Sequence, residues 1–213
     1  MYEKSATDLE LEKSVKEYEV SLRETFAQNY YTQQQTLELF KKTIEHCNLN
    51  NFKENKLIWN FASYINIVSF DLKIIGENLF LSTNDWGKRY FARQSALIIY
   101  ESLNDIFELS GKEFRNILSR FSADEELKTE IKQLTTELNE YKHKYFNKLK
   151  TIRNNCVAHR DKDCIEQLKI ITSLNWFESV ETLTGFDKIL MKYGVFMQKV
   201  IDISLEESKE LIK

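Results

Sequence analysis

Apolar side chains recur at intervals of three and four residues along most of the chain, which is the period of an amphipathic α-helix. The first such stretch covers residues 11–26, and a second, after the polar run 33–35, covers residues 37–44. The asparagine-rich stretch 48–51 predicts the end of this second helix, or of a bent continuation of the first. A stronger stripe over residues 57–79 predicts a helix that belongs mostly to the core.

The middle of the chain carries clear helix start and stop signals. Residues 82–85 offer several N-cap side chains for a helix that runs through residue 109 and stops at Ser110-Gly111. A short helical piece follows at residues 114–121.

The most regular apolar stripe extends from Leu127 to Cys156 and resembles a coiled-coil seam. The pattern leaves open whether this seam faces the chain's own core or another subunit. Its helix is expected to end near residues 159–161. Asp163 and Glu166 then have the spacing of a capping box that opens a helix through residue 171, and a last helix is expected over residues 186–212.

The composition agrees with long helices, because proline is absent and only five of the 213 residues are glycine. We therefore expect an all-α fold, a helical bundle of long antiparallel helices with extra N- and C-terminal helices. The length and the 42% apolar content fit a single domain over residues 1–213. Within it, residues 1–50 would form an N-terminal helical extension.

The formal charge of −3 argues against a protein that coats nucleic acid through overall attraction, so any RNA contact must be local. The chain contains no run of about 20 apolar residues, and its N-terminus lacks the apolar stretch of a signal peptide. The three cysteines have no zinc-type spacing. We expect no membrane span, no bound metal and a cytoplasmic location.

The motif segment, residues 149–163 with the sequence LKTIRNNCVAHRDKD, interrupts the apolar rhythm with a polar group at residues 153–155. It resembles the signature of the HEPN superfamily, in which an Arg followed by a polar residue, often Asn, precedes a His by a few residues. That His is commonly preceded by Ala. The matching residues here are Arg153, Asn154, Ala158 and His159.

The resemblance implies a HEPN-like helical domain that, in many members, is a metal-independent endoribonuclease without a cofactor. It further implies an RNA substrate and a homodimer, because the active site forms where the motifs of two subunits meet. Phage defence or a toxin–antitoxin system, with an antitoxin protein as partner, is the expected setting. Some family toxins carry a modified Tyr two positions after the His, but Asp161 stands there in this chain. Other members have lost catalysis, so a catalytically inactive module that binds protein or RNA is the alternative.

The motif residues also suit RNA cleavage on chemical grounds. Attack by a 2′-hydroxyl on the adjacent phosphorus needs a group that takes the proton and a cation that stabilises the phosphate oxygens. His159 can exchange the proton, because a histidine has an ordinary pKa of about 6.5. Arg153 offers a planar charged fork for phosphate, and Asn154 can orient the reacting groups. These three are the predicted catalytic residues.

In one ideal helix Arg153 and His159 would lie about 120° apart around the axis. The two side chains can converge only if the helix ends near Val157 or if a second copy supplies its own pair. The second possibility favours a homodimer.

Charge is unevenly placed along the long helix. Residues 124–140 hold six acids and two lysines, whereas residues 141–160 hold four lysines, two arginines and no acid. A phosphate-attracting patch and a favourable interaction with the helix macrodipole explain this gradient equally well. As substrate-binding residues we predict Asn155 and Arg160, together with Arg89 and Arg93 beside the aromatic Trp86 and Tyr90. For Arg89 and Arg93, a solvated helix face is the alternative reading.

Overall fold

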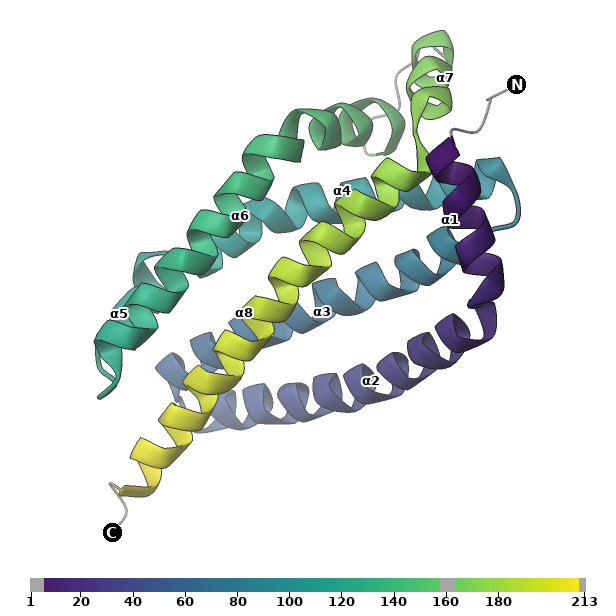
Figure 1. Cartoon of the computed structure of the whole chain (residues 1–213). Helices are drawn as coiled ribbons and strands as arrows, with labels where there is room; N and C mark the ends of the chain where they lie inside the picture. Colours follow the sequence, from purple (N-terminus) through teal and green to yellow (C-terminus); the bar gives the residue numbers. More distant parts are fainter. Residues whose placement is uncertain (1–5, 158–163, 211–213) are drawn as a thin grey trace.

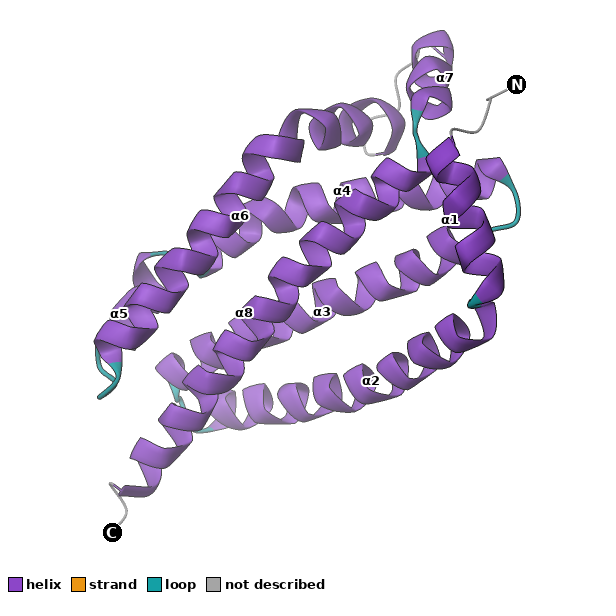
Figure 2. Ribbon diagram, in the orientation of Figure 1, coloured by secondary structure: helices purple, strands orange, loops and turns teal. Residues whose placement is uncertain are grey.

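The computed structural model describes residues 6–157 and 164–210, and every regular element within these ranges is helical (Figure 2). The predicted all-α bundle is therefore confirmed. The elements are α1 (Ala6–Glu17), α2 (Glu19–Leu49), α3 (Lys53–Leu81), α4 (Asp85–Leu109), α5 (Lys112–Leu118), α6 (Asp124–Ile152), the π-helix η1 (Arg153–Val157), α7 (Cys164–Ser173) and α8 (Trp176–Glu210).

The five long helices α2, α3, α4, α6 and α8 lie side by side along the length of the molecule (Figure 1). Consecutive long helices run in opposite directions, with α1 and α7 at one end and α5 at the other. Helix α3 packs against α2, α4 and α8, and α6 packs against α4 and α8. The end that holds α7 also holds η1, so the motif segment lies at one end of the bundle.

An aromatic cluster forms the centre of the core. The Phe61 ring of α3 meets the Phe114 ring of α5 edge to face, with 5.0 Å between centroids, and lies 6.0 Å from the Tyr193 ring of α8. Phe61 and Tyr193 are fully buried. Rings of this size contribute a large share of the apolar area that folding removes from water.

The regular stripe from Leu127 to Cys156 faces the chain's own core. Leu127, Leu138 and Leu149 are buried along α6, and Cys156 is buried at its continuation in η1. Because α6 packs against α4 and α8, these side chains are already covered within one subunit. The question left open by the sequence is thus answered for this stripe, which is not a seam for another chain.

The first expected helix boundary is wrong. The predicted helix over residues 11–26 is divided at Tyr18, and α2 continues without a break through the polar run 33–35. Helix α1 packs against α8 as well as α2, whereas α2 packs mainly against α3. The Gln33 side chain donates a hydrogen bond to the Ser69 hydroxyl of α3. The break at Tyr18 thus coincides with a change of packing partner from α8 to α3. The local pattern of apolar residues does not reveal this change.

The last helix begins earlier than predicted, at Trp176 rather than at residue 186, because two side chains accept hydrogen bonds from its first backbone amides. Asn175 Oδ1 accepts from the Glu178 amide at 2.9 Å. Asp8 Oδ1, from α1, accepts from the Phe177 amide at 3.1 Å. Acceptors of this kind stabilise a helix N-terminus, where the backbone N–H groups have no partner within the helix.

The predicted start and stop of α4 are confirmed, and the short helix predicted over residues 114–121 is α5, shifted to Lys112–Leu118. Asn84 caps α4 by accepting a hydrogen bond from the Gly87 amide at 2.7 Å, and α4 ends at Leu109, directly before Ser110. The capping box at Asp163 lies partly outside the described residues, although α7 does begin at Cys164.

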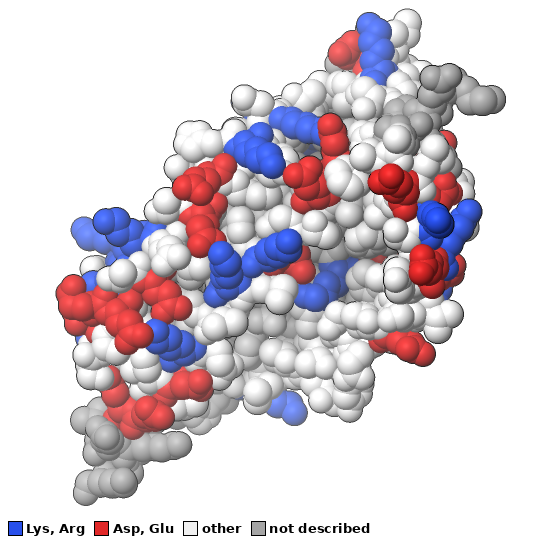
Figure 3. Space-filling view, in the orientation of Figure 1, with Lys and Arg blue, Asp and Glu red and all other residues white. Residues whose placement is uncertain are grey.

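The visible surface carries charges of both signs. Acidic and basic side chains are interspersed over α6 and α8, and acids gather toward the end that holds α5 (Figure 3). Within the described ranges, no helix combines the length and the apolar content that crossing a bilayer requires.

Candidate functional site

Helix α6 changes into the π-helix η1 within the motif segment, at Arg153. The wider π turn covers Arg153–Val157. In a π-helix the hydrogen bonds join residues five apart, so each residue turns less than the 100° of an α-helix. The angle of about 120° expected between Arg153 and His159 therefore does not apply. Ala158, His159, Arg160 and Asp161 lie outside the described residues.

Three contacts hold the Arg153 side chain. Its Nε donates to Glu101 Oε1 of α4 at 2.8 Å, and its Nη1 donates to Asn154 Oδ1 at 3.0 Å. Its guanidinium carbon lies 5.5 Å from the centre of the Tyr100 ring, within cation–π range. The side chain is still 25% exposed. Arg153 is thus oriented by its neighbours and remains open to a ligand from solvent.

The two asparagines of the motif segment differ in their contacts. Asn154 fixes the Arg153 fork from the adjacent position. Asn155 is partly exposed and makes no side-chain hydrogen bond within the described part of the chain. Asn154 is therefore placed to position the cation, and a substrate contact by Asn155 stays a prediction.

Cys156 anchors η1 against α4. Burial raises the pKa of its thiol, and the Arg93 guanidinium lowers that pKa by a smaller amount. The thiol therefore stays protonated near neutral pH and serves packing rather than nucleophilic chemistry.

Arg93 is buried, with 8% of its surface exposed, and its Nε donates to the Arg89 carbonyl at 3.2 Å. The rings of Trp86 and Tyr90 each lie 5.8 Å from its guanidinium carbon. The predicted association of Arg93 with these two aromatic residues is present. A contact between Arg93 and RNA stays a prediction, and it would require the site to open.

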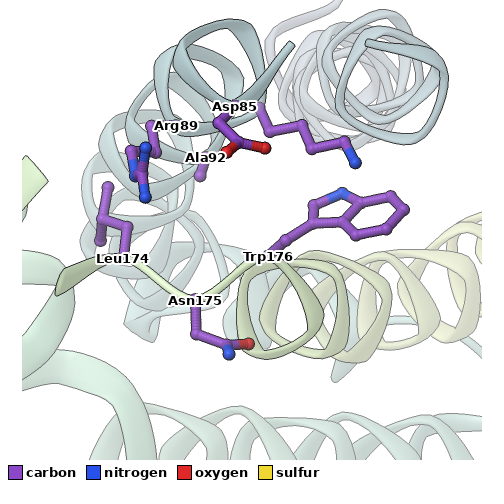
Figure 4. A pocket seen from close by; sticks show the side chains of 7 residues that line it. Asp85, Arg89, Ala92, Leu174, Asn175 and Trp176 are labelled. Carbon is purple, nitrogen blue, oxygen red and sulfur yellow. The ribbon is translucent and has the colours of Figure 1, made fainter. Parts of the chain in front are cut away.

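Arg89 lines a small cavity between α4 and the start of α8 (Figure 4). The cavity measures about 20 Å³, which is room for a water molecule and not for a nucleobase. Beside it, Lys88 Nζ lies 3.6 Å from the centre of the Trp176 ring and 4.0 Å from a Glu12 carboxylate oxygen. Lys88 thus links this end of α4 to both α1 and the start of α8.

The structure brings only some of the predicted site residues together. Arg153 and Asn154 are in contact, and Arg93 lies beside Cys156 of the same π-helix. Glu101, the partner of Arg153, stands eight residues beyond Arg93 on α4, about 12 Å along the helix axis. Arg93 and Glu101 thus contact η1 at different levels of α4.

Sequence reasoning missed the α4 side of this site. Glu101 and Tyr100 orient Arg153, yet 52 residues separate Glu101 from Arg153. Glu101 is one of several charged residues of α4, and nothing in the local sequence marks it as the partner of Arg153.

No metal site is evident in the described ranges. No group of three or more His, Cys, Asp or Glu side chains is placed there to hold a metal ion. Cys156 is buried and Cys164 is exposed.

Comparison with known proteins gives no match, either to a family model, to a curated protein or to a solved structure. A functional proposal therefore depends on the chain's own residues and geometry.

Replacing Glu101 by glutamine is expected to lower the free energy of unfolding by less than about 1 kcal/mol, because ion pairs that face solvent contribute little. Glu101 is 48% exposed, and Arg153 keeps its contacts with Asn154 and Tyr100. Urea denaturation measures the change.

Glu108→Gln is the matched control, since Glu108 is an exposed acid on the same helix. A loss of about 3 kcal/mol or more from Glu101→Gln alone would contradict this expectation, because a loss of that size is typical of breaking a buried ion pair.

Proposed function

We propose that this chain is a metal-independent endoribonuclease of HEPN type that cuts RNA through attack by the 2′-hydroxyl. The observation that carries the proposal is the π-helix that begins at Arg153, the first residue of the matching motif. Single π turns in otherwise regular helices are frequent at functional sites. Here the turn presents an arginine that is held by an acid, an amide and a ring and is still reachable from solvent.

The proposed roles follow from side-chain chemistry. Arg153 binds the scissile phosphate and stabilises the negative charge that develops on it. Asn154 positions the Arg153 fork. His159 takes the proton from the attacking hydroxyl or gives one to the leaving oxygen. A homodimer would gather two copies of these groups around one strand, and an antitoxin in a defence system would be the natural regulator.

The second candidate is a catalytically silent module that binds protein or RNA. The ion pair between Arg153 and Glu101 favours it, because a guanidinium that already has an acidic partner has less tendency to bind phosphate. In this reading the polar cluster stabilises the end of α6.

The test is incubation of the purified full chain with mixed cellular RNA in EDTA. The nuclease proposal predicts fragments with 2′,3′-cyclic phosphate ends. It also predicts no cleavage of a 2′-O-methyl oligonucleotide of matched sequence, which lacks the attacking hydroxyl. RNA that stays intact would exclude the nuclease and favour the binding module.

A further inference from the structure

Rings and cations alternate along the α4–α6 face, defined as Tyr100, Asn104 and Phe107 of α4 with Lys142 and Phe146 of α6 and Arg153 of η1. The Tyr100 and Phe146 rings stack with 5.1 Å between centroids and 27° between planes. Arg153 lies over the Tyr100 ring at one end of this stack. Lys142 Nζ lies 5.0 Å from the Phe146 ring and 5.1 Å from the Phe107 ring at the other.

The lysines in the second half of α6 form ion pairs with acids on one side of the helix only. Toward α8, Lys144 pairs with Glu181 at 3.4 Å and Lys148 pairs with Glu178 at 2.5 Å. Lys142 instead reaches the neutral Asn104 amide oxygen at 3.0 Å. Over the described residues, neither Lys142 nor Lys150 forms an ion pair with a carboxylate. Within the described part of the chain, Lys142 therefore carries a positive charge without an acidic partner on the side of α6 that faces α4.

The α4–α6 face is accessible. Tyr100, Phe107, Phe146 and Lys142 are all partly exposed. Of the acids in this part of α4, Glu101 pairs with Arg153, Asp105 accepts a hydrogen bond from the Tyr64 hydroxyl at 2.5 Å, and Glu108 is exposed. The face therefore presents Lys142 and the aromatic rings beside these carboxylates, with Arg153 at one end.

We propose that the α4–α6 face binds single-stranded RNA and leads it to Arg153, an inference that rests on the proposed function. Lys142 and Arg153 are eleven residues apart, about 16 Å along the helix, so together they can contact phosphates of a short run of nucleotides. When the flexible Lys142 side chain turns to a phosphate, it uncovers the Phe146 ring face for a base. Aromatic platforms of this kind bind unpaired bases, whereas a duplex keeps its bases stacked inside.

The test measures binding of a fluorescent single-stranded 2′-O-methyl oligoribonucleotide, which the proposed chemistry cannot cut. We expect Lys142→Gln to weaken binding about three- to tenfold and to reduce the slope of log K against log salt by about 0.7 to 1, as for one lost phosphate contact. Phe146→Leu should weaken binding about tenfold with little change in salt slope. A duplex of the same sequence should bind more weakly than the single strand.

Lys144→Gln is the matched control, because it removes the same charge two residues away on the side of α6 that faces α8. It should leave binding and salt slope nearly unchanged. Equal losses from Lys142→Gln and Lys144→Gln, or no binding by the unsubstituted chain, would overturn the proposal. Lys142 lies at the surface, so its variant tests the proposal even if Phe146→Leu proves unstable in a thermal melt.

Failure of this inference differs from failure of the nuclease proposal. If the Lys142 effect appears while natural RNA stays intact, the α4–α6 face binds RNA in a chain that does not cut it. If natural RNA is cut and Lys142→Gln changes neither binding nor cleavage, the nuclease stands and the strand follows another surface.

Discussion

Replacing His159 by alanine is expected to slow RNA cleavage by about 10²- to 10⁴-fold, the usual contribution of a general acid or base. Within the described residues, Arg153 is held by Glu101, Asn154 and Tyr100, so the phosphate-binding group has supports other than the imidazole. Binding of the 2′-O-methyl strand should therefore change little while the cleavage rate falls. Single-turnover cleavage in EDTA, with the chain in excess over labelled RNA, measures the rate.

His143→Ala is the control, because His143 is an exposed histidine on α6 and the substitution is chemically identical. Its cleavage rate should stay within about twofold of the unsubstituted chain, since its position gives it no proton to transfer. A His159 variant that cuts RNA as fast as the unsubstituted chain would remove His159 from the mechanism. An equal loss of rate in both variants would indicate damage to α6 rather than to chemistry.

Replacing Phe61 by alanine is expected to lower the free energy of unfolding by about 3–5 kcal/mol, the range for a buried aromatic residue replaced by alanine. Phe61 is 1% exposed and contacts the Phe114 and Tyr193 rings, so the substitution leaves a cavity between α3, α5 and α8. A loss of this size is a large part of the total stability of an ordinary domain. Thermal and urea denaturation followed by circular dichroism measure it.

Phe52→Ala provides the comparison, because this substitution also removes a phenyl ring. Phe52 lies between α2 and α3 and is 48% exposed. Its effect should stay below about 1 kcal/mol. An unchanged denaturation midpoint for Phe61→Ala would mean that the cavity collapses without cost and that the centre of the core lies elsewhere.

The sequence predicted those parts of the fold that local chemistry determines. The start of α4 follows from Asn84, whose cap involves a residue three positions away, and its end follows from Ser110. The buried stripe of α6 follows from its own periodicity. In these cases the interacting groups lie within a few residues of one another, so a single pass along the chain detects them.

The features that the sequence did not predict depend on residues far apart in the chain. The start of α8 is stabilised by Asp8, which accepts a hydrogen bond from the Phe177 amide 169 residues later in the chain. The orientation of Arg153 depends on Glu101 and Tyr100 of α4. The π turn over Arg153–Val157 combines both kinds of information, because the polar residues are visible in the sequence and the change of helical pitch is not.

The hydrogen bond from the Phe177 amide to Asp8 also has a consequence for how the chain is made. A ribosome produces Asp8 long before residue 177, and α1 leaves the exit tunnel without the amide group that it caps. Helix α1 can dock on α8 only after α8 has emerged. This docking is therefore a late step in the assembly of the bundle. A nascent chain that stalls before Trp176 lacks both the α8 surface on which α1 packs and the amide that Asp8 caps.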